Sequence, residues 1–134
     1  MLGSPHMHSA PYFTVFGLLT ILHAYRVIRL RQKYRVSLGT GGHPELERMI
    51  RVHGNHTEYV PMGLILLIGL EFVQAPAWYL HLCGLSLLAG RLLHAHGLAD
   101  SDGPSFGRVR GMQLTFLSLL LSSVGITLWT FVVP

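Results

Sequence analysis

Four polar side chains recur along one stretch of the chain at a spacing that places them on one side of a helix. They follow one another at intervals of three, four and three residues, and they are Arg48, Arg51, Asn55 and Glu58. At about 100° per residue this spacing confines them to one arc, so they form a polar stripe. Arginine binds carboxylates through two parallel hydrogen bonds, a carboxylate binds an ammonium group, and an amide both donates and accepts. The stripe therefore suits a ligand with two carboxylates and one amine.

The same stripe also fits a structural role. Glu58 could pair with Arg51 of a neighbouring chain, and Asn55 could bridge two helices through hydrogen bonds. Ionisable groups inside a membrane helix are costly and usually face the bundle interior or a polar cavity. The spacing leaves both interpretations open, a self-satisfied network and a ligand site.

Two later segments add basic side chains that the same ligand could use. Arg91 and His94 are three residues apart and share one face of a third expected helix, and Arg108 and Arg110 stand at the start of a fourth. Each of the last pair could equally be a topology signal, since basic residues gather on the cytoplasmic side of membrane proteins. Taken together, up to five arginines converge on one membrane face, and the nearby acidic residues do not cancel their charge.

Four segments of membrane-spanning length position these residues. A span needs about 20 residues at about 1.5 Å of rise each, and the expected spans are 12–30, 45–74, 77–98 and 107–133. The second span is polar in its first half, and Pro61 should bend it or free the carbonyl of Thr57. We expect an all-α membrane protein, an antiparallel bundle of four transmembrane helices formed by one domain of residues 8–134. Residues 1–7 resemble a cloning remnant and are excluded.

The composition indicates a membrane rather than an aqueous setting. Half of the 134 residues are hydrophobic and 12% are charged, against about 25% in soluble domains. A soluble domain this small cannot bury so much apolar surface. Although the net charge is +4, the basic residues flank apolar spans, so topology explains them better than binding to nucleic acid.

The basic residues also predict how the chain crosses the membrane. All ten Lys and Arg lie between Arg26 and Arg51 or between Arg91 and Arg110. In a protein with four spans these two regions lie on the same side. The positive-inside rule then places that side in the cytoplasm and both termini outside it.

The remaining reactive side chains point to structure. Cys83, the single cysteine, lies in an apolar run and is expected to be a core residue, because a catalytic thiol needs an electropositive and accessible setting. His53 lies away from the polar stripe. With one cysteine and no clustered acids, we expect no metal site. Gly107 and Gly111 form a G-x-x-x-G pattern that favours close helix packing.

The stripe and its neighbours resemble the MAPEG family, the membrane-associated glutathione and eicosanoid enzymes. The family pattern reads E-R-x-x-R-x-x-x-N-x-x-E followed by an aromatic residue and a proline. Seven positions agree at fixed spacing, namely Glu47, Arg48, Arg51, Asn55, Glu58, Tyr59 and Pro61. Residues 31–36, 90–94 and 108–115 also look like the family. The resemblance covers nearly the whole chain, and it is strongest to the short bacterial members.

The resemblance implies a homotrimer in a bacterial inner membrane. It implies glutathione as co-substrate, bound between protomers near the cytoplasmic half, and a lipophilic small-molecule substrate that enters from the membrane lipid. By position, the glutathione site would comprise Arg48, Arg51, Asn55, Glu58, Tyr59, Arg91 and His94, although Arg48 could be structural. Arg108 matches the arginine that stabilises the thiolate in catalytic members, because a guanidinium favours the charged form of sulfur. Arg110 competes for the same catalytic assignment.

One departure from the family bears on catalysis. Catalytic relatives often carry a tyrosine after the Arg-x-x-His of the third helix, and here His96 or Leu98 stands at that place. The first functional hypothesis is a glutathione transferase or peroxidase that attacks lipophilic electrophiles or lipid hydroperoxides. The second is a non-catalytic lipid-binding or scaffold protein, which the departure favours. A third, a small transporter subunit, draws only on the polar stripe.

Overall fold

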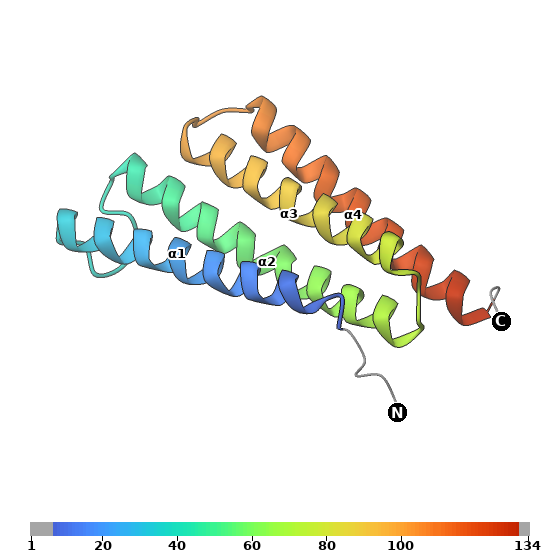
Figure 1. Ribbon diagram of the computed structural model, residues 1–134. Coiled ribbons are helices and arrows are strands. Elements are labelled where there is room, and N and C mark those ends of the chain that lie inside the picture. Colours follow the sequence, from blue (N-terminus) through green and yellow to red (C-terminus); the bar gives the residue numbers. More distant parts are fainter. Residues whose placement is uncertain (1–6, 132–134) are drawn as a thin grey trace.

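The computed structural model describes residues 7–131, which form four helices joined by short connections (Figure 1). The helices are α1 (Ala10–Tyr34), α2 (Pro44–Phe72), α3 (Ala77–Ala99) and α4 (Phe106–Phe131). Consecutive helices run antiparallel, and no strand occurs among the described residues, so the predicted all-α four-helix bundle is confirmed. Of the predicted cloning remnant, residues 1–6 lie outside the described part, and so do residues 132–134 at the end of the fourth expected span.

Local sequence signals explain where the helices begin and end. Pro11 and Pro44 stand in the first turns of α1 and α2, where the missing N–H leaves no helical hydrogen bond unmade. Arg35 closes α1 in the left-handed conformation, and three glycines at positive φ turn the chain toward α2. α2 continues through Pro61 as one helix.

The outer surface of the bundle suits lipid. Within the described residues, α1, α3 and α4 are long and apolar enough to cross a membrane. α2 has 29 residues, but its first half carries the polar stripe, so its composition does not meet the same criterion. Large apolar side chains nevertheless point outward from all four helices, among them Leu18, Ile65, Leu85 and Leu120. The predicted fourth crossing therefore rests on the length of α2 and on its place in the bundle.

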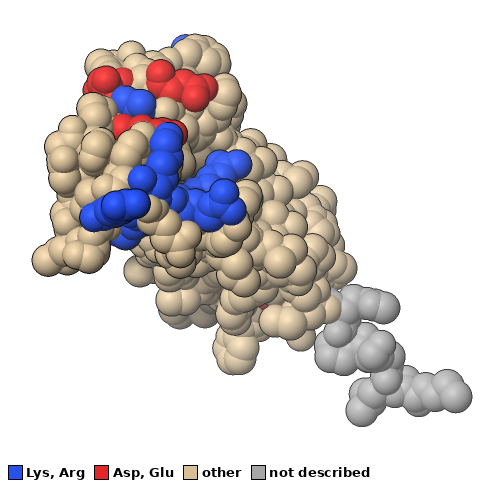
Figure 2. Space-filling view, turned by 90° about the vertical axis from the view of Figure 1, so that its left-hand side faces the viewer, with Lys and Arg blue, Asp and Glu red and all other residues tan. Residues whose placement is uncertain are grey.

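Most of the charged residues gather at one end of the bundle. Figure 2 looks onto the end where the α1–α2 and α3–α4 connections lie, and Lys, Arg, Asp and Glu side chains cluster there. α1 begins and α4 ends toward the opposite end (Figure 1). There, the carboxylate of Glu71 accepts hydrogen bonds from the backbone N–H of Ser9 at 3.2 Å, from its hydroxyl and from the N–H of His8. This contact fastens the start of α1 to the end of α2.

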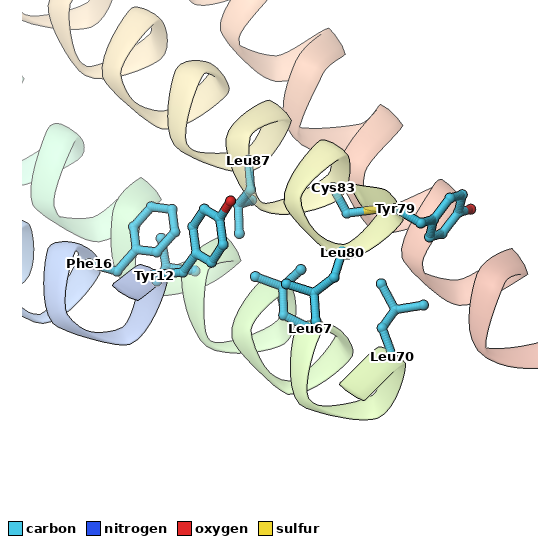
Figure 3. Close-up of a cluster of buried hydrophobic side chains, with 9 residues drawn as sticks. Tyr12, Phe16, Leu67, Leu70, Tyr79, Leu80, Cys83 and Leu87 are labelled. Atoms are coloured by element: carbon cyan, nitrogen blue, oxygen red, sulfur yellow. The ribbon is translucent and has the colours of Figure 1, made fainter. Parts of the chain in front are cut away.

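A buried apolar cluster joins the helices in the half of the bundle away from the charged end (Figure 3). Its fully buried members include Phe16, Leu67, Leu70, Cys83 and Leu87. Cys83 is therefore a core residue, as predicted. Tyr79 extends the cluster to α4, because its hydroxyl donates a hydrogen bond to the backbone oxygen of Leu121 at 2.7 Å.

α3 and α4 approach each other at backbone contact. A β-carbon at Gly111 would lie 2.5 Å from the backbone nitrogen of His94, and one at Gly90 would lie 2.8 Å from the carbonyl oxygen of Gly111. A β-carbon at Gly107 would lie 2.7 Å from the backbone of α3. Only small residues permit such an approach, so the predicted packing role of the G-x-x-x-G pattern is confirmed. This contact brings the face of α3 that carries Arg91 and His94 close to Arg108.

Candidate functional site

Three arginines line one cavity at the charged end, here called the arginine cavity. It has a volume of about 520 Å³ and lies between α2, α3 and the α3–α4 connection. Arg48 and Arg51 come from the polar stripe of α2, and Arg108 comes from the start of α4. The fold thus joins two of the predicted stripe residues to the predicted catalytic arginine. Converging guanidinium groups of this kind suit an anionic ligand.

Arg48 forms the shortest ion pair of the site. Its Nη1 lies 2.6 Å from Oδ1 of Asp102 in the α3–α4 connection, and the Asp102 side chain is 77% exposed. The Nε of Arg48 is buried and has no hydrogen-bond partner within the described residues. The ion pair therefore holds the connection beside the arginine cavity and leaves one donor of Arg48 unused.

Arg91 is buried between three helices and is only 3% exposed. Its Nη1 donates to Oδ1 of Asn55 on α2 at 2.6 Å, and its Nε donates to Oγ1 of Thr115 on α4 at 2.9 Å. Its guanidinium carbon lies 5.3 Å from the centre of the Tyr59 ring, which is cation–π distance. A buried charge needs partners of this kind. Arg91 thus holds the side chains of Asn55 and Tyr59 from the buried side of the bundle.

Arg51 and Glu58 are the accessible charges of the stripe. Their side chains are 58% and 53% exposed, and the nearest nitrogen and oxygen atoms are 3.9 Å apart. That distance, measured within the single chain, is longer than a hydrogen bond. Exposed ion pairs contribute about 0–1 kcal/mol, so both groups can exchange this partner for a ligand at little cost.

The two arginines at the start of α4 have different surroundings. Arg108 borders the arginine cavity and also a second cavity of about 410 Å³, which His94 lines together with apolar side chains such as Phe116. Its Nη1 donates to the backbone oxygen of Gly103 at 2.8 Å. Arg110 is exposed and donates to Oε1 of Gln113 at 2.9 Å. Arg108 is therefore the arginine that lies between a polar cavity and an apolar one.

Comparison with known proteins identifies the family of this chain. The model of the MAPEG family matches residues 9–128. The chain belongs to the MAPEG family. It is 42% identical over 115 residues to the inner membrane protein YecN of Escherichia coli (strain K12), covering 86% of each chain. It is 37% identical over 123 residues to leukotriene C4 synthase of Cavia porcellus, covering 84% of this chain and 78% of that relative. The resemblance predicted from the polar stripe is confirmed, and the protein is an integral membrane protein of a glutathione-linked family.

In this MAPEG protein, five of the seven residues that match the family pattern fall into two groups. Glu47, Arg48 and Arg51 line the arginine cavity. Asn55 and Tyr59 lie beside Arg91. Their contacts with a ligand, and those of Glu58, Arg91 and His94, stay predictions, while the grouping indicates which of them can touch a ligand directly.

Where the chain departs from the catalytic MAPEG pattern, the side chain at the cavity wall is apolar. Leu98 lines the arginine cavity and is 8% exposed. His96 points outward, with Nδ1 3.4 Å from a carboxylate oxygen of Asp100. Of the two residues at the predicted departure, Leu98 is therefore the one at the cavity wall, and it supplies no hydroxyl.

Sequence reasoning missed two residues of the MAPEG site. Asp102 lies in a connection rich in turn-forming residues, and nothing in that stretch points to Arg48. Thr115 belongs to a segment that resembles the family, and its hydroxyl both accepts from Arg91 and donates to the backbone oxygen of Gly111 at 2.8 Å. The sequence signal that could have identified Thr115 was its place one helical turn after Gly111, the glycine that packs closely against α3.

Proposed function

We propose that this MAPEG protein is a membrane-bound glutathione transferase or peroxidase that acts on lipophilic electrophiles or lipid hydroperoxides. One observation carries the proposal: Arg48, Arg51 and Arg108 converge on one cavity, and Arg108 also borders a second cavity with apolar walls. Membership of the family and similarity to leukotriene C4 synthase support the use of glutathione. A polar co-substrate and a lipophilic substrate could meet at Arg108.

The polar groups of glutathione match the accessible groups of the stripe. Glutathione carries two carboxylates and one ammonium group, and Arg51 can hold a carboxylate bidentately. Glu58 can accept hydrogen bonds from the ammonium group. Asn55 and Tyr59 would complete the tripeptide site, and Arg91 would act by holding these two side chains rather than by contact.

Arg108 would stabilise the thiolate, with Arg110 as the weaker catalytic candidate. A guanidinium near sulfur favours the anion, which is the nucleophile. In the transferase reaction a carbon–sulfur bond forms and the leaving group departs with its bonding electrons. In the peroxidase reaction sulfur attacks the hydroperoxide and releases the alcohol, and a second glutathione then reduces the sulfenic acid to disulfide and water.

The proposal includes a homotrimer in the bacterial inner membrane. The exposure of Arg51 and Glu58 in the single chain supports a site that a neighbouring protomer completes. The inner-membrane location is supported by the similarity to YecN, which is named an inner membrane protein. Bilayer lipid would then surround the apolar faces of the helices and deliver the lipophilic substrate.

The decisive experiment measures glutathione-dependent turnover by the detergent-purified protein. The substrates are 1-chloro-2,4-dinitrobenzene and cumene hydroperoxide, and Arg108→Ala is compared with Arg110→Ala. We expect Arg108→Ala to lower kcat/KM by about a hundredfold, as for loss of one preorganised stabilising group, while Arg110→Ala stays within about twofold. Calorimetry of glutathione binding shows whether a loss lies in affinity or in chemistry. Turnover no faster than background in the parent protein, across several electrophiles, would exclude the enzyme.

A non-catalytic lipid-binding or scaffold protein is the second candidate, and Leu98 favours it because the cavity wall lacks the expected hydroxyl. Tight glutathione binding without turnover would support this function. A transporter subunit is a weaker reading, and loss of glutathione affinity in Asn55→Ala or Glu58→Ala would argue against it.

A further inference from the structure

A second basic depression lies on the outside of the bundle, between the end of α1 and the start of α2. We call it the outer basic groove. It has a volume of about 510 Å³, and its walls are Tyr25, Arg26, Arg29, Leu30, Glu45 and Met49. None of these residues lines the arginine cavity. The proposed glutathione site therefore does not account for this groove.

Among the described residues, no ion pair neutralises the arginines of the groove. None of the four ion pairs of the described residues includes Arg26 or Arg29. Arg29 donates to the hydroxyl of Tyr25 at 3.1 Å and lies 5.8 Å from the centre of its ring, so it is held at the groove with its charge intact. Glu45, the one acidic wall residue, is occupied by Lys33 at 3.1 Å and by the hydroxyl of Tyr34.

An apolar track on α1 leads to the groove. Leu18, Ile21, Tyr25 and Ile28 are 63%, 67%, 53% and 51% exposed. Their intervals of three, four and three residues place them on one face of the helix. This face is open in the single chain and suits acyl chains of a bilayer, and the basic residues that follow can reach the headgroup region. By this order of apolar and basic side chains, the groove is expected at the depth where a phospholipid carries its phosphate.

We propose that the outer basic groove binds the phosphate of an anionic phospholipid, with an acyl chain along the exposed apolar face of α1. Two guanidinium groups can hold one phosphate through charged hydrogen bonds, and basic pockets at the cytoplasmic face of membrane proteins recognise anionic headgroups. A zwitterionic headgroup would bring its ammonium group close to Arg26 and Arg29, so net-anionic lipids are selected. This inference goes beyond the proposed function and shares no residue with it.

The test counts the lipids that the delipidated, detergent-purified protein binds. Dioleoyl phosphatidylglycerol and dioleoyl phosphatidylcholine are titrated separately, and adducts are resolved by native mass spectrometry. We expect the parent to prefer phosphatidylglycerol. The double variant Arg26→Gln/Arg29→Gln should lose about twentyfold or more in affinity for phosphatidylglycerol, or about fivefold for each arginine, without a change for phosphatidylcholine.

The matched control removes the same charge from the last turn of α1 and its capping residue, beyond the groove. Arg31→Gln/Arg35→Gln should keep the preference for phosphatidylglycerol within about threefold. Equal binding of the two lipids by the parent, or equal losses in both double variants, would overturn the proposal. Displacement of phosphatidylglycerol by inorganic phosphate at equal concentration would also overturn it, because the site would then be one for free anions.

Three further measurements separate the groove from other effects. The elution volume in detergent and the helical circular dichroism identify a misfolded variant, in which case Arg26→Gln alone carries the test with an expected loss of about fivefold. Glutathione binding should be unchanged in every variant of the groove. Loss of lipid selectivity with intact glutathione binding supports the groove, and absence of glutathione binding in the parent contradicts only the proposed function.

Discussion

Arg91 and Arg51 illustrate two roles of the same side chain at the scale of single residues. Arg91 is 3% exposed and makes hydrogen bonds to Asn55 and Thr115. The Arg51 side chain is 58% exposed, and its nearest acidic partner is 3.9 Å away. A desolvated guanidinium must keep its partners, whereas an exposed one can exchange water for a ligand. We therefore expect Arg51 to contact glutathione and Arg91 to act through Asn55.

This difference in role predicts that the effects of Arg91 and Asn55 on the free energy of unfolding are coupled. Arg91→Ala leaves Oδ1 of Asn55 without its donor, and Asn55→Ala leaves part of a buried charge without its acceptor. Each single change should destabilise the protein by about 3 kcal/mol, and the double variant should fall short of the sum by about 1–2 kcal/mol. Thermal unfolding in detergent measures the four proteins of the cycle. Strictly additive losses would show that the two side chains do not support each other.

Leu98 provides a second prediction at this scale, which rests on the proposed function. Leu98→Tyr adds a hydroxyl to the wall of the arginine cavity, where it can donate a hydrogen bond to the sulfur. We expect kcat for the transferase reaction to rise by about tenfold or more, because a well-positioned proton donor contributes about a hundredfold and an introduced one reaches only part of that. Leu98→Phe is the control for added bulk and should not show the gain. Equal rates in the two variants would show that the missing hydroxyl does not limit catalysis.

At the scale of elements, the close contact of α3 and α4 sets the geometry of the site. Glycines on both helices bring the backbones together, and this approach puts His94 and Arg108 on the wall of the same cavity. The α3–α4 connection follows at once, and Asp102 in it reaches Arg48 of α2. The position of the catalytic candidate therefore depends on helix packing as well as on its own side chain.

Replacing one of these glycines should disturb both stability and function. A β-carbon at Gly111 would lie 2.5 Å from backbone of α3, so Gly111→Ala must push the helices apart. We expect a loss of about 1–3 kcal/mol, as for overpacked cores, together with reduced turnover. Gly17→Ala is the matched control, because a β-carbon there meets nothing within 4 Å and alanine favours the helix by up to about 1 kcal/mol. A lower melting temperature for Gly17→Ala than for Gly111→Ala would contradict this account of the interface.

The difference between local contacts and contacts that are distant in sequence explains how far the sequence could predict the structure. The helices and the polar stripe follow from the length of apolar runs and from helical periodicity, both of which are local properties. The pairing of Arg48 with Asp102 joins residues 54 positions apart and depends on how a connection folds over the cavity. The choice between Leu98 and His96 could not be made either, because it depends on the rotation of α3 against its neighbours.

At the scale of the whole molecule, the separation of charge is what a reaction between a polar thiol and a lipophilic substrate requires. One end of the bundle carries the charged groups (Figure 2), and the sides present apolar surface. A water-soluble co-substrate can reach the charged end from the aqueous phase, while a lipophilic substrate approaches through lipid. The proposed anionic lipid in the outer basic groove would hold the same end at the headgroup layer.

The orientation of this charged end in the membrane is the last prediction. The positive-inside rule places the α1–α2 and α3–α4 connections in the cytoplasm and both termini outside it. In a Cys83→Ala background, Ser37→Cys in the α1–α2 connection should react with an impermeant maleimide only after the cells are opened. Phe72→Cys, at the end of α2 and 87% exposed in the parent, should react in intact cells. The reverse pattern would show that the orientation is inverted. Protection of both cysteines in intact cells would show that α2 does not cross the membrane. Its polar first half would then lie along the membrane surface instead of entering the bilayer.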